Sequence, residues 1–410
     1  MFHEITIQGF KSLEKVHLEL STLNLFVGTN ASGKSNFLDA LRLLQGIGYG
    51  FTVEEILNGK PKGVTSEVWE PIRGGSARAA FSPGRNGNPS EDSLISFTIK
   101  LSSPLDPGTR LEYSVSLSPV LRCIRSEKLM SDGKPVFDSG PIANAPDRPV
   151  FEVVYYHKKR GTQPHLEFDR SRPVLGQILH HGDCLPEHRK AVEACLHGLS
   201  NTQKIDPSPA ELRKYSTAQS VKRMGERGEN FAALVSAIIT DEGSRKAYVS
   251  WLKQLDPVEL DDVSIMRGAL EEPLFALRER GRDLPAPILS DGTLRFSAIS
   301  AAFFQPDIPD VLTIEEIENG IHPSRLRLLV ELLRSQPARE GRQVIATTHS
   351  PIVLAWLKEE DYQYTFFCKR DESRGASIIS PLNEVPNFME IVRKQPIGDL
   401  FAEGWLEGAL

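Results

Sequence analysis

Residues 28–35 read GTNASGKS, which matches the pattern G-x-x-x-x-G-K-S with Gly28, Gly33, Lys34 and Ser35 in the fixed positions. This pattern is typical of a phosphate-binding loop when a strand precedes it and a helix follows it. The glycines let backbone N–H groups surround a phosphate, Lys34 would reach the β- and γ-phosphates, and the Ser35 hydroxyl would hold Mg²⁺. An ordinary glycine-bearing turn is the alternative. The predicted nucleotide-binding residues are Gly28, Asn30, Ala31, Ser32, Gly33, Lys34, Ser35 and Asn36.

A second candidate group is the pair of glutamates that follows the apolar run VLTI at 311–314. A site that hydrolyses a nucleotide needs a strand-end carboxylate for Mg²⁺ and a group that orients the attacking water. Glu315 would hold the metal, through water, and Glu316 would polarise the water that attacks the γ-phosphate. The alternative is a solvated acidic turn, which is common after strands. The phosphate loop elsewhere in the chain favours the functional interpretation.

Two further motifs precede and follow this acid pair. His349 ends the apolar run RQVIATTHS, where its imidazole would contact the γ-phosphate and sense its loss. A structural histidine is the alternative. Ser290, Asp291 and Gly292 begin a helical pattern and would expose N–H donors, forming a second anion-binding helix N-terminus. The alternative is an ordinary N-cap.

The elements that must position these residues form an α/β pattern at both ends of the chain. Strand pairs are predicted for 93–101 with 110–117 and for 362–370 with 376–382. Helical spacing dominates residues 171–280, including LEEPLFALRER, and predicts a mainly helical insertion between an N-terminal part at 1–170 and a C-terminal part at 281–410. The other predicted strands are HEITIQGF, KVHLELSTLNLFVG, RPVFEVVYYHKK, DVLTIEE and RQVIATTHS. The predicted helices around the motifs are SNFLDALRLLQGI, PSRLRLLVELLRSQ and the short PIVLAWLK.

The composition excludes several classes of protein. With 410 residues, the chain is long enough for two or three domains, or for one domain with a large insertion. The net charge of −6 gives no global basic field for nucleic acid. Four scattered cysteines indicate a reducing compartment rather than a disulfide framework. No run approaches the ~20 apolar residues that span a bilayer, so we expect a soluble cytoplasmic protein without a membrane partner.

The ordered set GTNASGKS, LSDGT, TIEEIENGIHP and IATTHSP resembles the motifs of AAA/ABC-type P-loop ATPases of the SMC, RecF and OLD (overcoming lysogenization defect) class. The resemblance is close over residues 1–50 and 285–357. It implies an ABC-type ATPase head, in which a mixed sheet core adjoins an antiparallel β lobe. The segment ITIQGFKSL is also typical of these ATPases and implies that Lys11 lies near the nucleotide, with a surface lysine as the alternative.

This sequence departs from the usual motifs at three positions. Glu315 stands where the class usually has aspartate, and Ile317 stands where proline usually follows the acid pair. Asp291 replaces the glycine that is common in ABC transporters, which fits the soluble branch. The longer Glu315 side chain puts the detailed metal geometry in question.

The resemblance also implies partners. ATP with Mg²⁺ would be sandwiched between two heads, with Ser290, Asp291 and Gly292 of one head touching the γ-phosphate held by Lys34 of the other. We therefore expect a head-to-head dimer or a higher even oligomer, with residues 318–323 as a contact loop. Only 59 residues follow Pro351, too few for the Toprim nuclease domain of OLD proteins.

The expected effector is consequently a separate protein. The apolar C-terminal segment IGDLFAEGWLEGAL is predicted to dock on another surface. By family analogy the chain would be an ATPase that controls a separately encoded effector, a nuclease, in prokaryotic anti-phage defence. The alternative is a DNA-repair ATPase that binds DNA directly, as RecF and SMC proteins do.

Overall fold

The computed structural model describes residues 1–60, 69–83, 90–140, 148–156, 163–182, 184–255 and 260–409. The chain divides into two compact units. Unit 1 comprises Met1–Ser21, Gly28–Thr202 and Phe366–Pro381, and unit 2 comprises Thr22–Val27, Gln203–Thr365 and Leu382–Leu410. The chain passes from unit 2 to unit 1 between Val27 and Gly28, where the predicted phosphate loop begins. The predicted segments 1–170, 171–280 and 281–410 stay a prediction.

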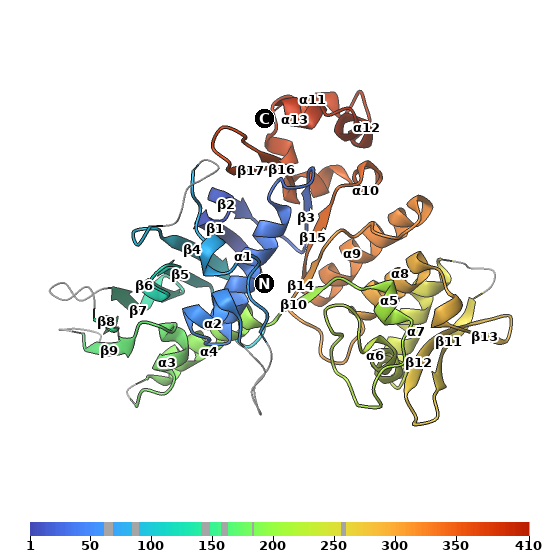
Figure 1. The fold of residues 1–410 in the computed structure, drawn as a ribbon, viewed down its shortest axis with the longest axis horizontal. Helices are drawn as coiled ribbons and strands as arrows, with labels where there is room; N and C mark the ends of the chain where they lie inside the picture. Colours follow the sequence, from blue (N-terminus) through green and yellow to red (C-terminus); the bar gives the residue numbers. More distant parts are fainter. Residues whose placement is uncertain are drawn as a thin grey trace. The chain divides into compact units, whose positions relative to one another are not determined.

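Unit 1 contains an antiparallel sheet whose described strands follow the spatial order β2-β1-β4-β5-β6-β7-β8-β9 (Figure 1). Successive side chains of a strand point to opposite faces, and in β1 Ile5 and Ile7 are buried while Thr6 between them is partly exposed. The predicted strand pair at 93–101 and 110–117 is confirmed as β4 and β5. The strands are β1 Phe2–Phe10, β2 Leu13–Glu19, β4 Ile95–Leu101, β5 Leu111–Ser118, β6 Cys123–Ser131, β7 Lys134–Gly140, β8 Val150–Tyr155 and β9 His165–Asp169.

Helix α1 (Lys34–Gly48) begins directly after the phosphate loop, as predicted. Its apolar face, which includes Phe37, Leu41 and Leu44, is buried in unit 1. The hairpin of β16 (Thr365–Arg370) and β17 (Ser377–Pro381) confirms the second predicted strand pair. The other helices of this unit are α2 Val53–Asn58, α3 Val174–Ile178 and α4 Pro186–Ser200.

Unit 2 contains a buried sheet in the order β10-β14-β15-β3, in which β14, β15 and β3 run parallel. Every residue of these three strands is buried, as expected for parallel strands covered on both faces. Helix α9 (Leu326–Glu340) connects β14 to β15 and lies against β15 and β3. The strands are β3 Leu23–Val27, β10 Thr202–Ile205, β14 Val311–Ile314 and β15 Gln343–Thr348.

A second sheet of unit 2 lies within the predicted helical insertion. Strands β11, β12 and β13 pair antiparallel in that order, and helices α6 and α7 pack on this sheet. The helix predicted for LEEPLFALRER is wrong, because Pro273–Glu279 forms β12 between two partner strands. A short apolar run such as LFAL fits a buried strand as well as a helix. The bounds are β11 Leu260–Arg267, β12 Pro273–Glu279, β13 Arg282–Pro285, α5 Pro209–Leu212, α6 Phe231–Ile238 and α7 Glu242–Lys253.

Two more features of the fold bear on the sequence-based prediction. The single strand predicted for KVHLELSTLNLFVG is divided into β2 and β3, which belong to different sheets.

Among the helices of the described ranges, none has the length and apolar character that a membrane span requires. The remaining helices, all in unit 2, are α8 Asp291–Ala301, α10 Pro351–Ala355, α11 Phe388–Ile391, α12 Ile397–Ala402 and α13 Trp405–Ala409.

Candidate functional site

The phosphate loop is shaped by two glycines that have no room for a side chain. A Cβ atom on Gly28 would lie 2.2 Å from the carbonyl oxygen of Cys368, and one on Gly33 would lie 2.1 Å from the hydroxyl of Ser377. Gly33 also has a φ of 109°, which L side chains rarely adopt, and it immediately precedes α1. The loop therefore runs close to β16 and β17 and then turns directly into the helix.

The Lys34 side chain folds back onto the phosphate loop and bonds its backbone. Its Nζ donates hydrogen bonds to the carbonyl oxygens of Gly28 at 2.6 Å and Thr29 at 2.8 Å, and the residue is only 7% exposed. The buried Ser32 hydroxyl finds no hydrogen-bond partner among the described residues. A buried polar atom without a partner is costly, so Ser32 marks a place where an added ligand would be stabilised. The exposed loop residues are Thr29, Asn30 and Ala31, and Ser35 and Asn36 are half-buried.

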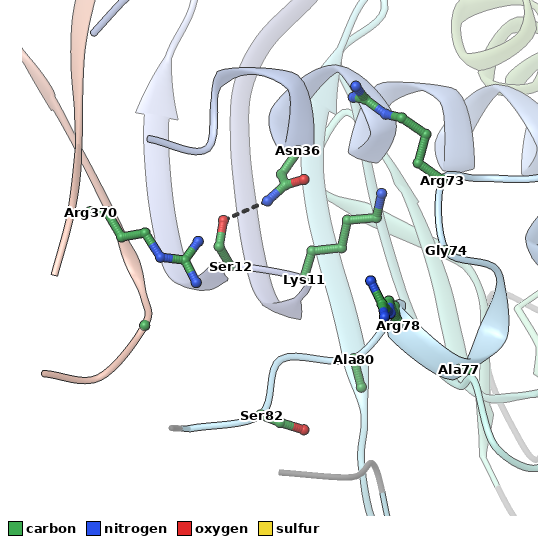
Figure 2. A pocket seen from close by; sticks show the side chains of 11 residues that line it. Lys11, Ser12, Asn36, Arg73, Gly74, Ala77, Arg78, Ala80, Ser82 and Arg370 are labelled. Carbon is green, nitrogen blue, oxygen red and sulfur yellow. Dashed lines mark hydrogen bonds between the residues drawn. The ribbon is translucent and has the colours of Figure 1, made fainter. Parts of the chain in front are cut away.

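A cationic cavity adjoins the first turn of α1 (Figure 2). Asn36 of α1 reaches into this region and donates a hydrogen bond to the Ser12 hydroxyl at 2.7 Å. Positive side chains from three parts of unit 1 surround the space, and such a lining suits a polyanion. The lining residues are Lys11, Ser12, Asn36, Arg73, Gly74, Ala77, Arg78, Ala80, Ser82, Arg370 and Gly375.

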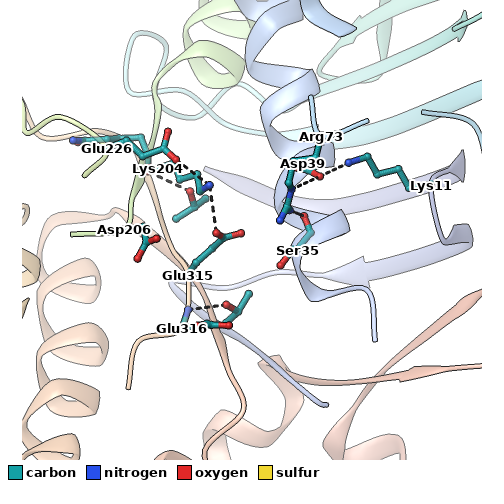
Figure 3. A network of polar contacts seen from close by, with 12 residues as sticks. Lys11, Ser35, Asp39, Arg73, Lys204, Asp206, Glu226, Glu315 and Glu316 are labelled. Atoms are coloured by element: carbon teal, nitrogen blue, oxygen red, sulfur yellow. Dashed lines mark hydrogen bonds and ion pairs between the residues drawn. The ribbon is translucent and has the colours of Figure 1, made fainter. Parts of the chain in front are cut away.

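Lys11 is tied to α1 by a buried ion pair (Figure 3). Its Nζ contacts the Asp39 carboxylate, and both side chains are less than 10% exposed. Arg73 bonds the same carboxylate at 3.1 Å through Nε and the Ser35 carbonyl oxygen at 2.7 Å. Burial lowers the pKa of the Lys11 ammonium, against the opposing effect of Asp39. Sequence reasoning missed Asp39, Arg73, Arg78 and Arg370, because no local motif distinguishes them from surface charges.

In unit 2, the acid pair follows β14 in a constrained turn. Glu316 has a φ of 45°, and its backbone N–H donates to the Thr347 hydroxyl at 3.0 Å. Arg295 of α8, which is 4% exposed, donates to the carbonyl oxygens of Glu315 at 3.0 Å and Glu316 at 3.1 Å. These contacts fix the backbone of the turn from β15 and from α8.

Three residues of the predicted site have left-handed backbone conformations. Across the described part of the chain, eight non-glycine residues have positive φ, and Lys11, Ala31 and Glu316 are three of them. Such conformations cost roughly 1–3 kcal/mol each and persist where surrounding contacts enforce them, often at functional sites.

The Glu315 side chain lies beside a lysine of the neighbouring strand (Figure 3). Lys204 of β10 is 3.4 Å from the Glu315 carboxylate and 3.0 Å from that of Glu226. Burial opposes the charged form of Lys204, but the Glu226 and Glu315 carboxylates outweigh it and raise the pKa of Lys204. Sequence reasoning missed this lysine.

His349 is paired with the third acid of the cluster, Glu318. The Glu318 carboxylate accepts the backbone N–H of His349 at 2.7 Å and lies 3.0 Å from its Nδ1. The Glu318 side chain is 10% exposed, whereas that of His349 is 48% exposed. The buried Glu318 carboxylate therefore holds both the backbone and the imidazole of His349 in place. Sequence reasoning placed Glu318 in the predicted contact loop and did not connect it with His349.

The predicted signature residues begin α8. The Ser290 hydroxyl accepts a hydrogen bond from the first turn of the helix at 3.2 Å, and Asp291 pairs with Arg213 at 2.5 Å. A Cβ on Gly292 would lie 2.7 Å from the carbonyl oxygen of Gly320, so the loop after the acid pair packs directly on the helix start. The two segments line one surface depression, formed by Ser290, Asp291, Gly292, Gly320, Ile321, His322, Ser324 and Arg325.

Three of the predicted motifs follow strands of one parallel sheet. Ile314 of β14 is in register with Ala346 of β15, which is in register with Leu25 of β3. The carboxyl ends of parallel strands lie at one edge of a sheet, which is where α/β proteins bind ligands. The acid pair, His349 and the first residue of the phosphate loop therefore all leave the sheet at the same edge.

Two family models match parts of the chain. Residues 1–55 match an AAA ATPase domain. Residues 247–355 match a family described as AAA domain, putative AbiEii toxin, Type IV TA system. These two segments contain the phosphate loop and the signature, acid and histidine motifs.

A curated relative matches nearly the whole chain. It is an ATP/GTP phosphatase of Helicobacter pylori (strain ATCC 700392 / 26695), 21% identical over 394 residues, and the match covers 91% of this chain and 94% of the relative.

Solved structures of SMC heads share the fold. An Smc head bound to the C-winged helix domain of ScpA has a TM-score of 0.52 at 13% identity and covers 93% of this chain and 98% of its own. An Smc head with an extended coiled coil, bound to the C-terminal domain of ScpA derived from Pyrococcus furiosus, has a TM-score of 0.51 at 12% identity, covering 96% and 99%. The predicted ABC-type head fold is confirmed.

Proposed function

We propose that this chain, a P-loop ATPase of the AAA/ABC type related to SMC and RecF heads, uses ATP-driven pairing of two heads to control a separately encoded effector. ATPase activity itself follows from the AAA family matches and the phosphatase relative. The observation that carries the site assignment is the common sheet edge from which the acid pair, the histidine and the phosphate loop emerge.

The phosphate loop would hold the triphosphate. Its backbone N–H groups would surround the phosphates, and Lys34 would exchange its bonds to the loop carbonyls for the β- and γ-phosphates. The Ser32 hydroxyl, which lacks a hydrogen-bond partner among the described residues, would donate to a phosphate oxygen. Lys11 and Arg73, which line the adjoining cavity, would add positive charge along the rest of the nucleotide.

The residues proposed for Mg²⁺ fit that ion chemically. The Ser35 hydroxyl and the Glu315 carboxylate are hard oxygen donors of the kind Mg²⁺ prefers. When bound, the ion would neutralise charge on the phosphate oxygens. Ser35 lies in the first turn of α1, and Glu315 directly follows β14.

Glu316 and His349 would carry out the hydrolytic step. Glu316 would accept a proton from the attacking water at its carboxylate, in an orientation set by its constrained backbone. His349 would contact the γ-phosphate through Nε2, because Glu318 occupies its Nδ1 side. Loss of the γ-phosphate would remove that contact.

The proposed effector and its biological role are argued from the comparisons with known proteins, not from the site itself. One matching family description includes a putative AbiEii toxin, which supports a role in defence. The solved Smc heads are bound to domains of ScpA, which supports a protein partner here. We accordingly infer an effector, a nuclease, in prokaryotic anti-phage defence.

Copurification tests the partner. The tagged Glu316→Gln variant is expressed from its native operon and purified in the presence of ATP. We expect the product of a neighbouring gene to copurify with it. ATP turnover with and without duplex DNA is measured in parallel. Strong stimulation by DNA with no protein partner would instead favour a DNA-repair ATPase that binds DNA directly.

A further inference from the structure

Lys204 lies between two carboxylates of unit 2. Its ammonium lies 3.0 Å from Glu226 and 3.4 Å from Glu315, the proposed metal ligand. All three side chains are partly buried, at 28%, 37% and 19% exposure respectively. At such distances a cation competes directly with a metal ion for the same carboxylate.

We infer that Lys204 is a placeholder cation, which neutralises Glu315 before metal binding and shifts towards Glu226 when Mg²⁺ arrives. Lys204 and Glu226 together would then set the metal affinity of the site. This inference rests on the proposed role of Glu315 as a metal ligand.

The charges favour such an exchange. A carboxylate at the end of a buried strand is costly without a counter-charge, and Lys204 supplies one. When a divalent cation reaches Glu315, the ammonium becomes a like charge beside it and is repelled. Glu226 offers the lysine a second carboxylate that it already contacts at the shorter distance, so the lysine need not be left buried and unpaired.

The length of the side chain at 315 fits this arrangement. Glutamate reaches one methylene further from the strand than aspartate would. Glu315 uses that reach to contact a lysine on the neighbouring strand β10. The contact with Lys204 thus gives a reason for the longer side chain at 315, in addition to the proposed metal binding.

Metal affinity can be measured without turnover. The protein is loaded with adenylyl imidodiphosphate and titrated with Mn²⁺, and free Mn²⁺ is followed by electron paramagnetic resonance. We expect Lys204→Met to bind Mn²⁺ roughly three- to tenfold more tightly, because a like charge beside the metal is removed. We expect Glu226→Gln to bind it more weakly, because the lysine then has only Glu315 to pair with.

The controls separate charge from structure. Lys204→Arg keeps the charge and should retain affinity close to the wild type. Lys222→Met removes an exposed lysine of the same unit and should change nothing. If Lys204→Met is poorly folded, the opposite shift expected for Glu226→Gln still tests the inference.

Two failures remain distinguishable. Unchanged Mn²⁺ affinity in Lys204→Met and Glu226→Gln, with a clear loss in Glu315→Gln, would overturn the placeholder role alone. Unchanged affinity in Glu315→Gln would overturn the proposed metal ligand, and the inference with it.

Discussion

Glu316 occupies a left-handed backbone conformation that glutamate seldom adopts, and two neighbouring side chains hold it there. Thr347 binds its N–H, Arg295 binds its carbonyl oxygen, and β14 ends immediately before the pair. Such a conformation is costly and persists where surrounding contacts enforce it. The constraint therefore supports a task that depends on where the Glu316 carboxylate points.

Replacing Glu316 by glutamine tests that task. The side chain keeps its size, but it can no longer accept a proton from water. We expect ATP binding to remain close to the wild type and hydrolysis to fall roughly 10²- to 10⁴-fold. Nucleotide titration and phosphate release measure the two effects. Glu340→Gln, an exposed acid at the end of α9, is the control. If Glu315→Gln proved the pure hydrolysis variant instead, the two roles would be exchanged.

Glu127 is a buried acid outside the proposed site. Its carboxylate accepts the backbone N–H groups of Val174 at 2.6 Å and Leu175 at 3.2 Å, and the hydroxyl of Tyr113 at 3.0 Å. Burial raises the pKa of Glu127 to about 7, although these three donors oppose the shift. It thus joins the start of α3 to the antiparallel sheet.

The raised pKa of Glu127 predicts how stability depends on pH. The folded state holds this proton more tightly than the unfolded state, so the contribution is fully present below about pH 4.5 and is lost as the pH rises through about 7. The loss is worth about 3 kcal/mol. We expect Glu127→Gln to flatten the pH dependence of Tm in this range. Glu112→Gln, exposed on β5, should retain the wild-type profile, and equal profiles in all three proteins would contradict the prediction.

At the scale of elements, the start of α1 is locked against β17. Gly33 precedes the helix, and a methyl group there would overlap the Ser377 hydroxyl. That hydroxyl also pairs with Ser12 at 2.6 Å, at the turn between β1 and β2. The phosphate loop thus depends on three segments that are far apart in the sequence.

Gly33→Ala tests this packing. The new Cβ would require both a left-handed backbone and a displaced Ser377, so we expect a loss of about 2–4 kcal/mol in the free energy of unfolding and weaker ATP binding. Gly140→Ala, where nothing lies within 4 Å, is the matched control. Ser377→Gly should recover part of the loss in the double variant. No recovery would show that backbone strain alone accounts for the effect.

The sequence predicted these elements unevenly, for physical reasons. The strands and helices around the motifs were predictable because each carries a long periodic pattern or a glycine turn. The segment LFAL in β12 was misread, since its strand character comes from pairing with β11 and β13. Likewise, Lys204, Glu226 and Asp39 looked like surface charges. Only tertiary folding brings Lys204 to Glu315 and Lys11 to Asp39.

At the scale of the whole molecule, the site as proposed is incomplete in one chain. The phosphate loop belongs to unit 1, and the signature residues begin α8 in unit 2. The Ser290 side chain is exposed, and Gly292 is packed against the loop at 320–322. Both features suit a surface that meets a second head, and symmetric pairing would then create two equivalent sites.

Mixing two inactive variants tests whether sites are shared between chains. Lys34→Ala should lose ATP binding but keep an intact signature, and Ser290→Arg should block the signature but keep an intact phosphate loop. Neither should hydrolyse ATP alone. In an equimolar mixture, half of the dimers would be mixed and each would contain one complete site, so about a quarter of the wild-type activity should return. Steady-state ATP turnover measures it, with light scattering to confirm the dimers. A mixture that stays inactive although mixed dimers form would show that each site is built within one chain, and would exclude the proposed sharing.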